Sequence, residues 1–81
     1  MEKEIGKITH YFEKVQVAVV ELSGKLKVGD TIHIKGHTTD FTQKVSSMQV
    51  EHEDIETAKS GDSLGLKVSE RVRLNDKVFL A

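Results

Sequence analysis

Apolar and polar residues alternate over short stretches of this chain, and turn residues separate the stretches. A Gly-Asp pair at 29–30 precedes the alternating segment 31–35, and a second pair at 61–62 precedes the segment 63–68. A period of two places every second side chain on one face of an extended strand, and Gly-Asp supplies a tight turn. Together the patterns predict a small antiparallel β-protein.

The segment 15–22 has the strongest β-propensity in the chain. Its odd positions from Val15 to Val19 form one apolar row, and its even positions from Ala18 to Leu22 make the opposite face apolar as well. We therefore expect this strand to be covered on both sides near its end. The predicted core consists of Val17, Val19, Ile32, Ile34, Val45, Leu64, Leu66 and Val78.

A break in the alternation falls inside the next long strand. Phe41 and Val45 share one parity, whereas Met48 and Val50 have the other. A flat strand cannot bury both sets on the same face. The sequence therefore predicts a bulge or a sharp bend near positions 46–47, a device by which barrels turn corners.

The segment 54–59 predicts a single helical turn, with Asp54 as its cap and Gly61 past its end. No longer helix is indicated. Six short strands separated by turns, in a chain of 81 residues, predict one domain over residues 1–81. The expected fold is an all-β antiparallel barrel with Greek-key-like connections.

Composition restricts the chemistry that the chain can carry. The absence of cysteine excludes disulfides and thiolate metal sites, and a net charge of −1 gives no global attraction to nucleic acid or acidic membranes. No apolar run suits a signal peptide or a membrane span, which needs about 20 residues. We expect a cytoplasmic chain without membrane contact.

Few side chains suggest catalysis or metal binding. His33 and His37 lie four residues apart, a spacing that suits a metal pair on a helix, whereas here a strand and its following loop are predicted. The acidic run 51–54 could hold a hard cation or supply a general base, but the exposed end of a strand is the favoured interpretation. No phosphate loop and no nucleophile elbow occur. We therefore expect no enzyme activity, catalytic residue, metal, nucleotide or cofactor.

Cationic and aromatic side chains give a weak indication of a binding function. On a small barrel the cations could converge on phosphates while an aromatic ring stacks on a base. The candidates are Lys25, Lys27, Lys35, Lys67, Arg71 and Arg73, with Tyr11, Phe12 or Phe41 for stacking. A solvated set of cations balanced by thirteen acids is the other interpretation. The loop 37–40 is equally open between a binding edge and turn chemistry, with Asp40 bonding local amides.

Three stretches together resemble the second domain of elongation factor Tu and its translational GTPase relatives. They are Leu-Lys-Val-Gly-Asp at 26–30, Ala-Lys-Ser-Gly-Asp-Ser-Leu-Gly-Leu at 58–66 and Asn-Asp-Lys-Val at 75–78, where Asn75 replaces the usual glycine. The resemblance implies a Greek-key barrel of the translation-protein type that contacts transfer or ribosomal RNA. GTP binding is not implied, because the phosphate loop is missing.

Two further stretches resemble a barrel fused to the C-terminus of collagenase-like peptidases linked to RNA modification. They are Gly-Lys-Ile-Thr-His-Tyr-Phe at 6–12, and Thr-Thr-Asp-Phe-Thr-Gln at 38–43 continuing to Ser-Met-Gln-Val-Glu at 47–51. Two functions follow from the two resemblances. The leading prediction is a non-catalytic, elongation-factor-like barrel that binds RNA or a ribonucleoprotein in translation, with tRNA or ribosomal RNA as the partner. The alternative is an accessory barrel that docks on a protein partner, a peptidase or RNA-modifying enzyme.

Overall fold

The structure, a computed structural model, describes residues 3–51 and 53–81. These residues form ten β-strands and no helix. The strands are β1 (Lys3–Phe12), β2 (Val17–Leu22), β3 (Leu26–Lys27), β4 (Thr31–Lys35), β5 (Asp40–Lys44), β6 (Met48–Val50), β7 (Glu53–Ile55), β8 (Thr57–Ala58), β9 (Ser63–Lys67) and β10 (Lys77–Leu80).

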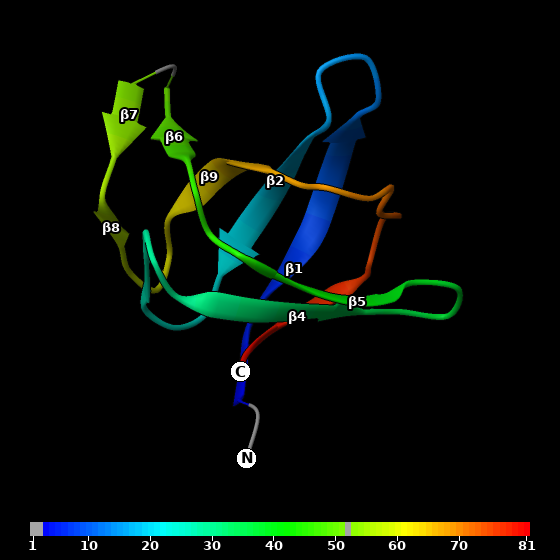
Figure 1. The fold of residues 1–81 in the computed structure, drawn as a ribbon. Coiled ribbons are helices and arrows are strands. Elements are labelled where there is room, and N and C mark those ends of the chain that lie inside the picture. The colour runs from blue at the N-terminus through cyan, green and yellow to red at the C-terminus, as the bar shows by residue number, and fades with distance from the viewer. Residues whose placement is uncertain (1–2, 52) are drawn as a thin grey trace.

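Eight strands form one antiparallel sheet in the order β5-β4-β10-β1-β2-β9-β6-β7, and β3 pairs with β8 in a separate ladder. Figure 1 shows the sheet curling strongly, so that the β4–β5 hairpin crosses in front of β1 and β2. The predicted fold class, a small all-β antiparallel barrel, is confirmed. The strand number differs from the predicted six, because the segments after residue 22 break into shorter strands at the corners of the barrel.

A single side chain links the β5 edge of the sheet to the segment that follows β9. The Gln43 amide donates from Nε2 to the carbonyl oxygen of Lys67 at 2.9 Å, and its Oε1 accepts from the Ser69 backbone N–H at 2.8 Å. The Ser69 hydroxyl adds a contact to the same Oε1 at 3.2 Å. Side-chain hydrogen bonds therefore close the barrel here, where no backbone ladder runs between β5 and β9.

The buried core lies on the concave side of the sheet. Six of the predicted core residues are buried there, namely Ile32, Ile34, Val45, Leu64, Leu66 and Val78. Val17 and Val19 were wrongly placed in the core: both are only half-buried, while Ala18, Val20 and Leu22 face inward. The cause is the cross-strand neighbours, since Val20 lies between Ile8 and Leu64, whereas Val19 lies between His10 and Gly65.

The predicted bend near positions 46–47 is confirmed. β5 ends at Lys44, where it pairs with β4, and β6 begins at Met48, where it pairs with β9 and β7. Between them the Val45 N–H donates to the Asp30 carbonyl at 2.8 Å. Val45 and Met48 are both 1% exposed, so the change of direction lets residues of opposite parity reach the same core.

The helical turn predicted over 54–59 is wrong. This segment forms β7 and β8, and β8 pairs with β3 so that Ala58 lies opposite Leu26. The carboxylate of Asp54 caps no helix and instead accepts a hydrogen bond from Gln49 Nε2 at 2.9 Å. Burial of Leu26 and Ala58 in a ladder outweighs the weak preference of a six-residue segment for a helix.

Three turns with one geometry lead into β4, β9 and β10. Each is a four-residue segment, at 27–30, 59–62 and 73–76, whose last residue is an aspartate. The aspartate N–H donates to the carbonyl of the first residue at 3.1 Å, and its carboxylate accepts from the N–H of that residue at 2.8–3.1 Å. The third residue has positive φ: Gly29 at 100°, Gly61 at 94° and Asn75 at 71°. The predicted turns are confirmed, including asparagine in place of glycine.

Candidate functional site

The outer face of β2 carries an apolar row that the rest of the barrel leaves uncovered. Val17 and Val19 lie on this face, opposite Phe12 and His10 of β1 and opposite Lys67 and Gly65 of β9. The sequence predicted that both faces of β2 would be covered. Among the described residues only the inner face is.

A groove of about 580 Å³ follows this row. Its apolar lining consists of Phe12, Val15, Val17, Val19 and Leu64, and its polar lining consists of Gln49, Glu51 and Ser63. Gly65 lies on its floor, where a Cβ atom would come within 3.2 Å of Val17 Cγ1. The β1–β2 and β6–β7 hairpins project from the same end of the barrel, with β2 and β9 between them (Figure 1).

Phe12 and Val15 form the most exposed apolar part of the groove. Phe12 is 48% exposed and Val15 is 59% exposed. The Phe12 ring packs against the imidazole of His10 with ring centroids 4.3 Å apart and a 59° angle between the planes. This contact holds the aromatic ring on the outer face of the sheet, where it forms one wall of the groove.

On the β6–β7 side of the groove, the charged side chains are acidic. Glu51 lines the groove, and Glu53 and Asp54 follow it in the same hairpin. Within residues 3–51 and 53–81, no ion pair joins these three carboxylates to a cation. On the opposite side Lys67 lies next to Val17 across the β2–β9 ladder. The groove therefore combines an apolar floor with an acidic lip.

The cations predicted to bind RNA lie on several separate elements of the described structure. Tyr11, Arg71 and Arg73 line a second, shallower cleft of about 420 Å³, together with His10 and Leu74. There the Arg71 guanidinium lies 3.6 Å from a carboxylate oxygen of Glu13, with both side chains largely exposed.

The remaining predicted residues lie on other elements. Lys67 belongs to β9. Lys27 belongs to β3, and Lys25 comes just before that strand. Lys35 ends β4 opposite Asp40. Phe41 is half-buried in β5 and packs on the core, as Tyr11 also does. A binding role for these side chains stays an untested prediction.

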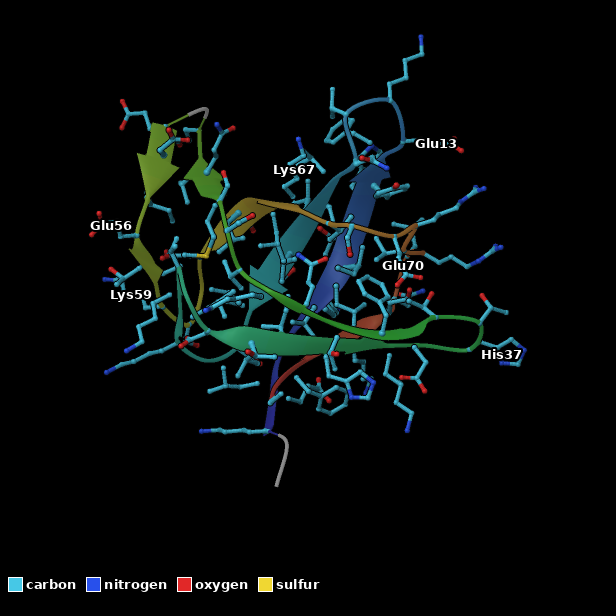
Figure 2. All side chains as sticks on the ribbon, in the orientation of Figure 1. Glu13, His37, Glu56, Lys59, Lys67 and Glu70 are labelled. Carbon is cyan, nitrogen blue, oxygen red and sulfur yellow. The ribbon has the colours of Figure 1, made fainter. Side chains whose placement is uncertain are left out.

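The β4–β5 hairpin brings the side chains of His33 and Asp40 together. His33 Nε2 bonds Asp40 Oδ1, and this hydrogen bond lowers the pKa of the Asp40 carboxyl, with the His33 and Lys35 charges acting in the same direction. One of the two interpretations left open for this loop had Asp40 bonding local amides, but the carboxylate bonds His33. The Gly36 N–H instead donates to the Thr39 carbonyl at 2.7 Å and closes the loop. His37 points away from the barrel at the hairpin tip (Figure 2).

The acidic run and the metal candidates gain no further support. His52 lies outside the described residues, and its neighbours Glu51, Glu53 and Asp54 are exposed. Among the residues that the structure describes, no group of three or more potential ligands gathers around a point that could hold a metal ion. No helix in the described part of the chain is long and apolar enough to cross a membrane.

Comparison with known proteins relates the chain to peptidases. No protein-family model matches it. It is 46% identical over 78 residues to an uncharacterized protease of Methanocaldococcus jannaschii and 39% identical over 77 residues to a collagenase of Porphyromonas gingivalis. The matches cover 95% and 93% of this chain but 19% and 21% of those proteins, so the chain spans about a fifth of their length.

Solved structures share the fold of this chain. The C-terminal domain of a Geobacillus thermoleovorans "putative U32 peptidase" matches with a TM-score of 0.89 and 18% identity, over 94% of this chain and 96% of that domain. A second structure of the same domain gives a TM-score of 0.86 over 91% of this chain and 86% of that one. At this identity the likeness shows the fold, a small β-barrel.

The elongation-factor interpretation is therefore wrong. The relatives are a protease and collagenases, so the sequence comparisons support the collagenase-like resemblance and not a role in translation. The motifs that suggested elongation factor Tu are the three aspartate turns. Their residues are required by positive φ and by the aspartate hydrogen bonds, so any barrel with such turns can share them.

Sequence reasoning missed the groove because it assigned the outer valines to the core. One signal was available: Gly65 interrupts the segment 63–68, and glycine inside a strand marks a bulge or the close approach of a ligand or another backbone. Pairing Gly65 with Val19 would have indicated which face of β2 is open.

Proposed function

We propose that this chain is an accessory barrel that docks on a protein of the U32 peptidase and collagenase type. The observation that supports it most is the 46% identity to a protease of which the matched segment forms only a fifth. In that relative, the matched segment belongs to a chain about five times as long, and the rest of that chain offers a surface on which the barrel can dock. The groove supports the same function, because an exposed apolar patch with a polar rim is typical of a protein-interaction surface.

We propose further that the chain contributes binding and no catalytic group. The lining of the groove supports this: among the described residues it is largely aliphatic, and Ser63, which supplies its hydroxyl, has no described histidine or lysine beside it in the lining. A nucleophile of that kind needs an adjacent base to react. A cytoplasmic location is also proposed, and cell fractionation would test it.

Affinity capture tests the docking function. The tagged chain is incubated with native lysate, with and without nuclease treatment, and bound proteins are identified by mass spectrometry. We expect enrichment of a U32 peptidase or collagenase-like chain, unchanged by nuclease, and direct binding when that protein is purified. If no such protein is enriched, or if its enrichment disappears with nuclease, the proposal is wrong.

A further inference from the structure

We propose that the groove on the outer face of β2 seats an amphipathic segment of the peptidase-type partner, with aliphatic or aromatic side chains on Val17 and Val19 and a lysine or arginine facing Glu51. This inference deepens the proposed function and rests on it. It names the surface that docks and the chemistry of the segment that fits.

The apolar half of the inference follows from the floor and walls of the groove. Val17 and Val19 present methyl groups, Phe12 supplies a ring that packs on His10, and Gly65 leaves the floor open beside Val19. Glycine inside a strand costs roughly 0.5–1 kcal/mol relative to alanine. At an outward position flanked by Val17 and Val19, the missing side chain makes room for an incoming one.

The charged half follows from the lip of the groove. Val50 pairs with Glu53, so Glu51 lies in the short connection between β6 and β7, where it has a φ of 51°. Such loops favour asparagine or glycine, because a positive φ strains most side chains. Turn geometry therefore gives no reason for a glutamate at this position. A cationic group of the partner does, because the carboxylates of Glu51, Glu53 and Asp54 have no cation of their own among the described residues.

A partner protein fits the groove better than a second copy of this chain. Two copies meeting face to face would bring the acidic lips of both grooves into one interface. Like charges brought together oppose such an association. Nucleic acid is disfavoured by the same lip, since the carboxylates would face phosphates.

Thiol labelling in a chimera tests the inference. The 78-residue matched segment of the Methanocaldococcus jannaschii protease is replaced by this chain, which supplies no cysteine of its own. Val17→Cys probes the groove, and Thr42→Cys, exposed on β5 outside it, is the matched control. Labelling rates are read peptide by peptide with mass spectrometry, in the chimera and in the isolated chain.

We expect Val17→Cys to react at least about tenfold more slowly in the chimera than in the isolated chain, with Thr42→Cys unchanged within about twofold. Equal rates for Val17→Cys in both proteins would overturn the inference. If light scattering shows that the isolated chain dimerises and that Val17→Cys is protected there, a second copy is the occupant and the inference is also overturned.

Charge reversal gives a second readout that needs no chimera. Glu51→Lys should weaken capture of the purified peptidase-type partner roughly fivefold. Glu70→Lys makes the same charge change on the segment after β9, away from the β6–β7 hairpin (Figure 2), and should leave capture unchanged. Equal loss in both variants would contradict a local role for Glu51. If both charge variants still capture the partner and Val17→Cys is not protected in the chimera, the chain still docks on the partner, but the groove is not the docking surface.

Discussion

The two faces of β2 are almost equally apolar, but only one of them is buried in the structure. The inner face, Ala18, Val20 and Leu22, is buried against the core. The outer face, Val17 and Val19, forms the floor of an open groove. The apolar content of a strand therefore does not fix which side is buried. Its cross-strand neighbours do: Ile8 and Leu64 continue the core beside Val20, whereas His10 and Gly65 end the apolar layer beside Val19.

The inner face of β2 contributes to folding stability, whereas the outer face is available to bind a partner. Substitutions on the inner face remove packing from a domain so small that its stability margin is thin. Substitutions on the outer face remove contacts that a partner would supply. The two kinds of change should therefore affect different measurements.

The largest expected difference in unfolding free energy is between an alanine substitution on the inner side of the sheet and one on its outer side. Leu66→Ala deletes a side chain that is fully buried on β9 and should cost roughly 2–5 kcal/mol of unfolding free energy. Val17→Ala, one strand away on the outer face, should cost less than about 1 kcal/mol. Urea denaturation monitored by circular dichroism measures both. Equal losses would mean that the outer row is packed as tightly as the inner one.

Barrel closure gives the next largest effect. Gln43→Ala removes the amide that bonds Lys67 and Ser69, and it should cost roughly 0.5–1.5 kcal/mol, because the hydrogen bonds that close the barrel are lost while water can reach the exposed Lys67 carbonyl and Ser69 N–H. Thr42→Ala, next to it and exposed, should cost little. Urea midpoints give both values. An unchanged midpoint for Gln43→Ala would show that the core alone keeps the barrel closed.

Filling the floor of the groove should change binding more than folding. Gly65→Val places a side chain 3.2 Å from Val17 Cγ1, and it should move the unfolding free energy by no more than about 1 kcal/mol, since crowding opposes the gain in β-propensity. Capture of the peptidase-type partner should fall sharply, because the added side chain occupies the space of the incoming one. Intact capture with intact stability would place the docking surface elsewhere.

The smallest effect concerns the exposed hairpin away from both faces of β2. The pKa of Asp40 is lowered from 3.8 by its hydrogen bond to His33, so the pair stabilises the fold above that pH. This contribution is lost as the pH falls below 3.8 and through the lowered pKa of the folded state. In acid titrations of stability, Asp40→Asn should flatten the curve in this range. An unchanged curve there would show that the pair contributes nothing to the stability of the fold.

Much of the fold could be predicted from local patterns. The alternation around Ile32 and Leu64 predicted buried strands, and the change of parity between Val45 and Met48 predicted the bend, because burial imposes a period of two on any strand. The aspartate turns were equally predictable, since few residues tolerate positive φ. These features depend on neighbours in sequence.

The errors fall where contacts distant in sequence decide the outcome. The segment around Asp54 has a helix-like beginning, but pairing between Leu26 and Ala58 makes it extended. The face of β2 that is buried depends on Ile8 and Leu64, which lie far from it along the chain. The groove could not be found for the same reason: its lining comes from three separate stretches of the chain, 12–19, 49–51 and 63–65, which only the folded barrel brings together.

The central claim is that Val17 and Val19 face solvent while Val20 and Leu66 are buried. Methyl-resolved NMR of the isolated chain with a soluble gadolinium agent measures this directly. We expect strong relaxation enhancement for the methyl groups of Val15, Val17 and Val19, and little for those of Val20 and Leu66. Weak enhancement at Val17 and Val19 together with strong enhancement at Val20 would contradict the account and restore the opposite orientation of β2.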